Sequence, residues 1–290
     1  MIVRRAEVTG MCPGVRNAVQ TAFAIPYPRE VTILGELVHN EQVLGDLARR
    51  GFHMVSESDR DRLPPTPKVL APAHGISQRQ VSRLARAGKQ VIDATCPFVR
   101  EIRETAQALK REGRLVIVIG KRGHVEVEGI VGDLDRYEVV AETSEVASYP
   151  SARLGVVCQS TTASKNAERI VQAIRASNPG KDIRYVPTIC PATCDRQAAV
   201  RSLLGHVDAL VVVGGKNSNN TIELVKLARS REVPCFHVQT AADIRPDWFR
   251  SMDVVGLTAG ASTPDAVIES VYETLFTLDV EAGTPALLRA

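Results

Sequence analysis

Three of the six cysteines are followed directly by proline and recur at similar intervals along the chain. They are Cys12, Cys96 and Cys190, in the segments CPGVR, CPFVR and CPATCDR. Proline suits the first turn of a helix, where its missing N–H costs no hydrogen bond, so each cysteine is expected at a helix N-terminus. The helix dipole there favours a thiolate, which is the form that binds metals. The repeat therefore predicts three similar lobes whose cysteines could meet at one metal site.

The other three cysteines are weaker candidates. Cys158 and Cys235 lie in apolar runs, where burial as small hydrophobic side chains is the simpler interpretation. Cys194 follows Cys190 by one helical turn and could be a spare ligand, although packing is again the simpler interpretation.

Three thiolates can bind zinc or an iron–sulfur cluster. Zinc sites usually use closely spaced cysteine pairs, and the sequence contains no C-x-x-C. A cubane cluster held by three cysteines would leave one iron open for Lewis-acid chemistry and electron transfer. The spacing alone leaves a cluster and simple burial of the thiols as alternatives.

Histidines follow three of the expected strands. His39, His74 and His124 stand in GELVHN, PAHGIS and GKRGHVEVEG, each next to glycine or asparagine. Because ligands of open α/β sheets bind beyond the carboxyl ends of the strands, we expect these histidines to bind an anion.

Two polar loops precede expected helices and supply further donors. GGKNSNNT at 214–221 contains Ser218, Asn219 and Asn220, and AGASTPD at 259–265 contains Ser262. Neither loop matches the phosphate-binding P-loop, but backbone and side-chain donors at a helix N-terminus suit a phosphate. Helix capping alone would also explain these residues.

One carboxylate stands close to this set. Glu126 is two residues after His124, and a buried carboxylate with a raised pKa could deliver protons. The hydroxyls of Ser160 and Thr161, in QSTT, could relay a proton or cap a helix beginning near Ala163. An exposed helix glutamate is the alternative interpretation.

The elements that must position these residues alternate between strand and helix. Strands are expected at 31–36, 68–72, 90–94, 115–120 and 209–215, and amphipathic helices at 40–52, 77–88, 97–113 and 221–233. Alternation of this kind predicts an α/β protein with parallel sheets. We expect three lobes, at 1–95, 96–189 and 190–290, the last including a C-terminal tail.

The composition excludes several classes of protein. The chain has 290 residues, 44% of them hydrophobic, and a net charge of only +3. A nucleic-acid binder would be expected to carry a strong basic stripe, and a membrane protein an apolar run of about 20 residues. We expect a cytoplasmic protein whose ligand is a small anion.

Taken together, these segments resemble one family, the LytB or IspH family of 4-hydroxy-3-methylbut-2-enyl diphosphate reductases in the non-mevalonate isoprenoid pathway. The matching pieces run in family order from Cys12 to about Pro264: GMCPGV, ELVHN, PAHGIS, DATCPFV, GHVEVEG, QST, ICPAT followed by DRQ, GGKNSNN and TAGASTPD.

The resemblance implies an oxidoreductase with three lobes arranged pseudo-threefold around a 4Fe-4S cluster on Cys12, Cys96 and Cys190. It implies that Glu126, Ser160 and His124 take part in catalysis and that a ferredoxin or flavodoxin supplies electrons. The substrate diphosphate would be held by residues of the polar loops and strand ends, namely His39, His74, His124, Thr161, Ser218, Asn219, Asn220 and Ser262.

The sequence departs from the family pattern at three positions. Ser160 stands where the family usually has threonine, Asn219 where serine is common, and Cys194 adds a thiol near Cys190. A paralogue that performs another reductive elimination or a dehydration, or a cluster-based redox sensor, is therefore an alternative.

Overall fold

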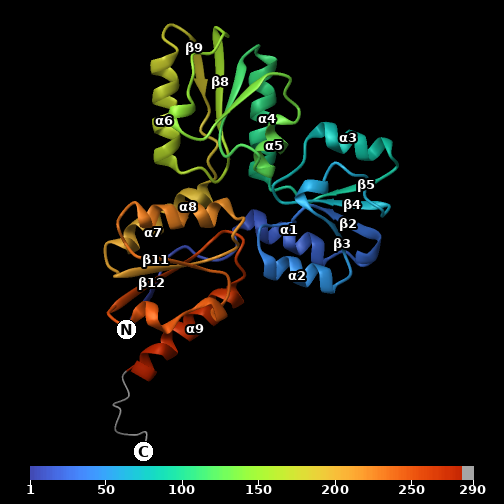
Figure 1. Cartoon of the computed structure of the whole chain (residues 1–290). Coiled ribbons are helices and arrows are strands. Elements are labelled where there is room, and N and C mark those ends of the chain that lie inside the picture. The colour runs from blue at the N-terminus through green and yellow to red at the C-terminus, as the bar shows by residue number, and fades with distance from the viewer. Residues whose placement is uncertain (283–290) are drawn as a thin grey trace, which may run out of the picture. The chain divides into compact units, whose positions relative to one another are not determined.

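The computed structural model describes residues 1–282, which contain three four-stranded sheets (Figure 1). Every pair of neighbouring strands is parallel. The described residues form two compact units: unit 1 contains residues 1–12, 39–41 and the chain from Pro191 onward, and unit 2 contains 13–38 and 42–190. The α/β class and the three parallel sheets predicted from the sequence are confirmed.

Unit 1 is built on one sheet with the strand order β1-β12-β10-β11. The strands are β1 (Ile2–Arg5), β10 (Ala209–Val213), β11 (Cys235–Val238) and β12 (Val254–Ala259). Side chains of α7 (Pro191–Leu204) and α8 (Asn219–Arg229) pack against one face, and those of α9 (Asp265–Ala282) against the other. Both faces are thus buried, which explains the continuous apolar run of β10.

The N-terminal strand does not belong to the sheet formed by the residues that follow it. The sequence analysis placed residues 1–95 in a first lobe, whereas β1 pairs with β12 from Ile2 beside Val254 to Arg5 beside Leu257. A four-residue strand carries no local signal of its partner, so this pairing could not be read from the sequence. The other lobe boundaries stay a prediction.

Unit 2 contains two sheets. The first has the order β3-β2-β4-β5 and consists of β2 (Val31–Leu34), β3 (His53–Val55), β4 (Lys68–Ala71) and β5 (Gln90–Asp93). Helices α1 (Pro13–Phe23) and α2 (Glu41–Arg49) lie on the other side of this sheet from α3 (Gln78–Arg86) in Figure 1.

The second sheet of unit 2 has the order β7-β6-β8-β9. Its strands are β6 (Leu115–Ile119), β7 (Tyr137–Val140), β8 (Arg153–Cys158) and β9 (Asp182–Tyr185). Alternate residues of β6 and β8 point to opposite faces, where α4 (Pro97–Arg111) and α5 (Val125–Val131) cover one side and α6 (Ser164–Ser177) the other.

Three helices begin directly after the cysteines of the Cys-Pro segments, as the sequence predicted. Proline is the first residue of α1, α4 and α7, so Cys12, Cys96 and Cys190 each directly precede a helix. Ser77 caps α3 by accepting a hydrogen bond from the Gln80 amide. Within residues 1–282, no helix combines the length and apolar character needed to cross a bilayer.

Candidate functional site

Backbone hydrogen bonds place two of the Cys-Pro cysteines beside other predicted site residues of unit 2. The Cys96 amide donates to the carbonyl of Ala73, the neighbour of His74, at 2.9 Å. The Cys190 amide donates to the carbonyl of Ser160, also at 2.9 Å. Both cysteines are partly exposed. Each of these two cysteines is therefore fixed to a loop that carries a predicted binding or catalytic residue.

Gly14 is a site residue that the sequence analysis did not single out. It lies in the first turn of α1, two residues after Cys12, and a Cβ atom built on it would lie 2.3 Å from Cys96 Sγ. Real Cβ atoms do not approach a sulfur so closely, so a larger residue would force the Cys96 thiol or α1 to move. The glycine of the CPGV segment was the available signal.

Glu126 and Ser160 form a buried pair. The Ser160 amide donates to Glu126 Oε1 at 2.7 Å, and the Ser160 hydroxyl donates to Oε2 at 2.9 Å. Glu126 is 4% exposed and Ser160 is 7% exposed. The carboxylate is therefore held in one orientation and shielded from solvent, next to the residue that anchors Cys190.

His124 occupies the N-cap position of α5. Its Nδ1 accepts a hydrogen bond from the Glu126 amide at 3.1 Å. Since an accepting ring nitrogen carries no proton, the proton of the neutral imidazole lies on Nε2, which can donate to a ligand. The predicted anion-binding histidine thus also fixes the start of the helix that carries Glu126.

The loop of His74 packs on the same helix. A Cβ on Gly129 of α5 would lie 3.5 Å from the Gly75 carbonyl oxygen and 3.7 Å from that of His74. His74 itself is 7% exposed, and its Nε2 lies 3.9 Å from a carboxylate oxygen of Glu57. Unit 2 therefore brings His74, His124 and Glu126 together around α5.

Unit 1 brings together a second group of predicted residues. The Cys12 amide donates to the Ala261 carbonyl at 3.0 Å, and the Ala261 amide donates to Asn220 Oδ1 at 3.0 Å. The hydroxyl of the next residue, Ser262, donates to the His39 carbonyl at 2.9 Å. His39 therefore belongs with the polar loops of unit 1, although it follows a strand of unit 2.

The loop before α8 combines helix capping with a buried donor. Ser218 caps α8 by accepting from the Thr221 amide at 3.3 Å, as the capping interpretation predicted. Asn219 is the first residue of the helix and is partly exposed. Within residues 1–282, Nδ2 of the 3%-exposed Asn220 has no hydrogen-bond partner. A buried donor without a partner is costly, so this atom is suited to an anionic ligand.

Comparison with known proteins identifies the family. The model of the LytB protein family matches residues 3–276. The chain belongs to the LytB family. Curated relatives named 4-hydroxy-3-methylbut-2-enyl diphosphate reductase include one from Thermoanaerobacter sp. (strain X514), 35% identical over 96% of this chain and 98% of the relative. Another, from Anaeromyxobacter sp. (strain Fw109-5), is 36% identical over 98% of this chain and 100% of the relative.

Solved structures of LytB-type enzymes have the same fold. The E-1-hydroxy-2-methyl-but-2-enyl-4-diphosphate reductase from Plasmodium falciparum matches with a TM-score of 0.85 and 26% identity, over 98% of this chain and 89% of that one. A second structure, of (E)-4-hydroxy-3-methyl-but-2-enyl diphosphate reductase, matches with a TM-score of 0.64 and 32% identity. It covers 96% of this chain and all of that one. The family resemblance predicted from the motifs is confirmed.

Arg196 is a second residue of this LytB protein that the sequence analysis passed over. It belongs to the DRQ segment of α7 and is 2% exposed. Its guanidinium donates to the carbonyl of Ala192, in the first turn of α7, at 3.0 Å and to that of Gly10. Arg196 thereby ties the loop that leads to Cys12 to the start of α7, which follows Cys190.

Two cysteines of this LytB protein behave as core residues. Burial raises the pKa of the Cys158 thiol to about 11 and that of the Cys235 thiol to about 11, so both are protonated at neutral pH. Cys158 lies in the apolar cluster between the second sheet of unit 2 and α6. These surroundings are consistent with the prediction that both cysteines serve as small hydrophobic side chains of the core. Cys194 lies in α7, one turn after Cys190, and is partly exposed.

Proposed function

We propose that this LytB protein reduces 4-hydroxy-3-methylbut-2-enyl diphosphate to isopentenyl and dimethylallyl diphosphate. The reaction consumes two electrons and two protons and releases the substrate hydroxyl as water. The observation that carries the proposal is the buried pair of Glu126 and Ser160, which lies beside Cys190. In a chain of this family, the pair places a proton donor that is shielded from solvent next to a thiol that could hold a metal.

Cys12, Cys96 and Cys190 are the proposed ligands of a 4Fe-4S cluster. The donor set fits such a group: each thiol precedes a helix whose dipole stabilises a thiolate, and each is partly exposed. Cys158 and Cys235 lie in strands β8 and β11 rather than before a helix, so they lack that stabilisation. When bound, a cluster with three cysteine ligands supplies electrons and an iron position open to a substrate oxygen.

The diphosphate is proposed to bind to donors of the polar loops and of the strand ends. In unit 1 the strongest support is Asn220, whose Nδ2 is buried without a partner, together with Ser262, His39 and the N-terminus of α8. A phosphate oxygen at Asn220 would satisfy that donor and gain from the helix dipole. His74, His124 and Thr161 are the proposed contacts from unit 2.

Glu126 is proposed to deliver the protons. Its carboxyl group is held by Ser160 through two hydrogen bonds, so it cannot turn away between proton transfers. The Ser160 hydroxyl can pass a proton between Glu126 and the leaving hydroxyl. The Nε2–H of His124 would hold an oxygen of the substrate at the start of the same helix. Fixed donors of this kind act on the transition state without reorganising.

The proposal is tested by anaerobic turnover. The reconstituted protein is incubated with 4-hydroxy-3-methylbut-2-enyl diphosphate and reduced methyl viologen, and the two products are quantified. Product formation that depends on both iron loading and reductant supports the proposal. A protein that loads and reduces its cluster but yields neither product would have a different substrate. A ferredoxin or flavodoxin is the proposed natural electron donor.

A further inference from the structure

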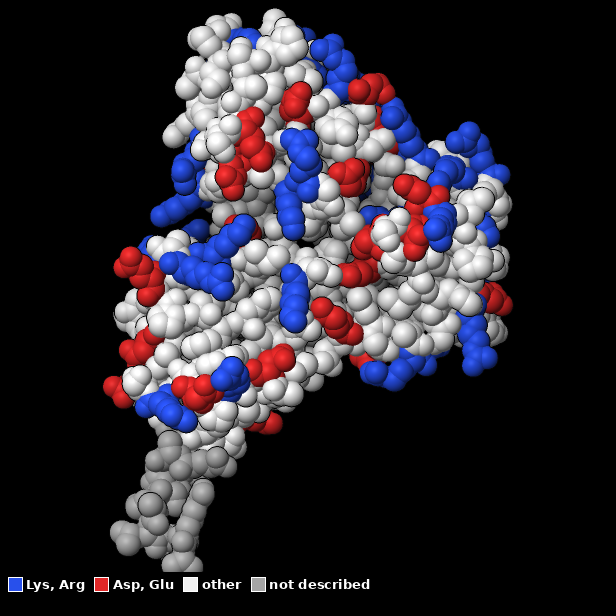
Figure 2. All heavy atoms as spheres, viewed as in Figure 1, with Lys and Arg blue, Asp and Glu red and all other residues white. Residues whose placement is uncertain are grey.

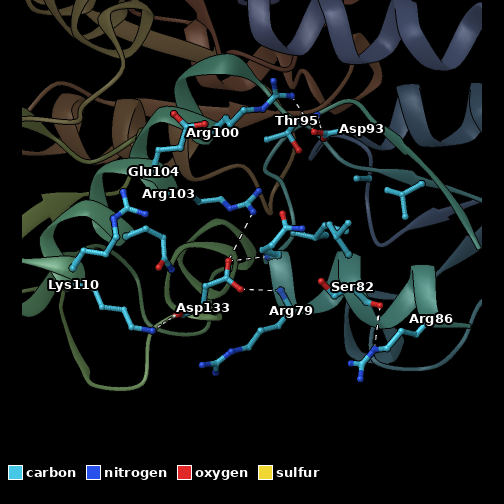
Figure 3. A pocket seen from close by; sticks show the side chains of 17 residues that line it. Arg79, Ser82, Arg86, Asp93, Thr95, Arg100, Arg103, Glu104, Lys110 and Asp133 are labelled. Carbon is cyan, nitrogen blue, oxygen red and sulfur yellow. Dashed lines mark hydrogen bonds and ion pairs between the residues drawn. The ribbon is translucent and has the colours of Figure 1, made fainter.

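Unit 2 contains a groove of about 920 Å3 that is not part of the proposed substrate site. Helix α4 forms one wall, α3 and the end of β5 form the other, and Asp133 lies at one end (Figure 3). Arg103 points from α4 toward Asp133, which also accepts from the first two amides of α3 at 2.8 and 2.9 Å. The two walls are thereby held at a fixed separation.

The groove is basic. Three acids line it, Asp93, Glu104 and Asp133, against six bases, Arg79, Arg86, Arg100, Arg103, Lys110 and Arg111. The whole chain, by contrast, has 36 bases and 33 acids. In Figure 2 blue Lys and Arg side chains follow the side of unit 2 that carries α3 and α4. The residues lining the groove therefore carry a formal excess of three positive charges, which Asp135 lowers to two because it pairs with Arg79 and Lys110.

Two of these charges, Arg86 and Arg111, are available to a partner. The other four are paired: Arg100 with Asp93 at 2.9 Å, Arg103 with Asp133 at 3.9 Å, and both Arg79 and Lys110 with Asp135. Among the described residues, no carboxylate pairs with Arg86 or Arg111, and both side chains are exposed.

The groove also contains buried donors without acceptors. Arg103 Nε and Gln107 Nε2, both on α4, have no hydrogen-bond partner within residues 1–282. A buried N–H that is left unpaired costs about 1–3 kcal/mol, so a ligand rich in acceptor oxygens is favoured. Carboxylates satisfy both the charge and the hydrogen-bonding requirement.

One end of the groove reaches a proposed cluster ligand. Asp93 and Thr95 line it, and the next residue, Cys96, occupies the N-cap position of α4. The bases of α4 then follow along the same helix, so that Arg111 lies about 22 Å from Cys96 at 1.5 Å per residue. A small protein of about 100 residues is wide enough to cover this length, with part of its surface next to Thr95.

We propose that this groove docks an acidic electron-carrier protein, which delivers electrons next to Cys96. The inference rests on the proposed function, because only a reductase needs such a donor, and it adds the surface on which the donor binds. A protein donor is favoured over a small anion because the bases are spread along the whole of α4. Rim charges of this kind govern the rate of association and its salt dependence.

The test compares two charge-reversal pairs. The groove variant is Arg86→Glu with Arg111→Glu, which lie in the last turns of α3 and α4. The control is Arg169→Glu with Arg175→Glu, two exposed residues of α6 on the opposite face of the β7-β6-β8-β9 sheet. Both variants change the net charge equally, and Arg111 and Arg175 both lie in the last turn of a helix.

Each protein is assayed with an acidic two-iron ferredoxin, kept reduced by NADPH and its reductase, and separately with reduced methyl viologen. We expect the groove variant to lower kcat/KM for ferredoxin about tenfold or more at low salt and to flatten its salt dependence. Turnover with methyl viologen, a small cation, should stay at the parental rate. The control pair should leave both rates near those of the parent.

Binding of labelled ferredoxin, measured by fluorescence anisotropy, tests the surface independently of turnover. Weaker binding by the groove variant alone supports docking even if the parent fails to turn over this substrate, which separates the two proposals. Equal weakening by the control pair overturns the inference, since net charge would then explain it. The inference is also overturned if the groove variant loses activity with methyl viologen as much as with ferredoxin. It is overturned as well if the groove binds inorganic pyrophosphate while the groove variant binds ferredoxin as tightly as the parent does.

Discussion

The buried pair of Glu126 and Ser160 gives the sharpest prediction, because one substitution removes the proton and keeps the shape. The Ser160 amide donates to Oε1 of Glu126 at 2.7 Å, and in Glu126→Gln the side-chain oxygen can still accept this hydrogen bond. The new amide group can donate to the Ser160 hydroxyl, which now acts as acceptor in the 2.9 Å contact. Stability and iron content should therefore stay close to the parental values.

Activity should fall steeply in the same variant. A positioned general acid contributes about 10²–10⁴-fold to a rate, and glutamine has no proton to give at neutral pH. We expect kcat for product formation with reduced methyl viologen to fall within that range, while KM changes little. The assay is anaerobic turnover, combined with iron content and thermal unfolding of the same preparation.

Variants of Ser160 separate positioning from proton donation. Ser160→Ala removes the hydroxyl hydrogen bond to Glu126 and keeps the backbone one, at a cost of about 1–3 kcal/mol. If that hydrogen bond is needed in the transition state, kcat falls about 5- to 150-fold, because each 1.4 kcal/mol is a factor of ten. Ser160→Thr, which retains the hydroxyl, should keep most of the activity. Full turnover by Glu126→Gln with an intact cluster would refute the reasoning.

Three further predictions concern the cysteines, Gly14 and Asn220. Cys190→Ser should abolish cluster binding, whereas Cys158→Ser should keep the cluster, as measured by iron content and visible absorbance, because the Cys158 thiol is protonated and buried. Normal loading of Cys190→Ser would exclude it as a ligand. Gly14→Ala should displace the Cys96 thiol and reduce iron retention at a cost of about 1–3 kcal/mol in stability; unchanged retention and unfolding temperature would contradict the close contact. Asn220→Asp keeps the acceptor for the Ala261 amide but replaces the buried donor with a negative oxygen, so KM for the diphosphate should rise about tenfold or more. An unchanged KM would remove Asn220 from the diphosphate site.

Local features of the fold were readable from the sequence because their causes are local. Proline after cysteine predicted the starts of α1, α4 and α7, and the apolar runs predicted β2, β4, β5, β6 and β10. Each of these signals acts within one helical turn or one strand. The Ser218 cap of α8 was also predictable, since its acceptor and donor are three residues apart.

Contacts between distant segments were not readable in the same way. The pairing of β1 with β12, the association of His39 with Ser262, and the approach of Gly14 to Cys96 join segments that are far apart in the sequence. The relevant residues have ordinary local surroundings, so periodicity and turn chemistry carry no information about their partners. Arg196 likewise gives no local sign of its partner, because Gly10 lies far from it in the sequence.

At two of the three positions that depart from the family pattern, the hydrogen bonds that position Glu126 and begin α8 are present. Ser160 lacks the methyl group of threonine but keeps the hydroxyl and amide that hold Glu126. Asn219 is the first residue of α8, whereas the cap is supplied by Ser218, so the exchange leaves the cap in place. Cys194 is one turn into α7 and is partly exposed. The residues present here thus supply the hydrogen bonds that fix Glu126 and begin α8, so we expect the exchanges at Ser160 and Asn219 to leave the orientation of Glu126 and the start of α8 unchanged.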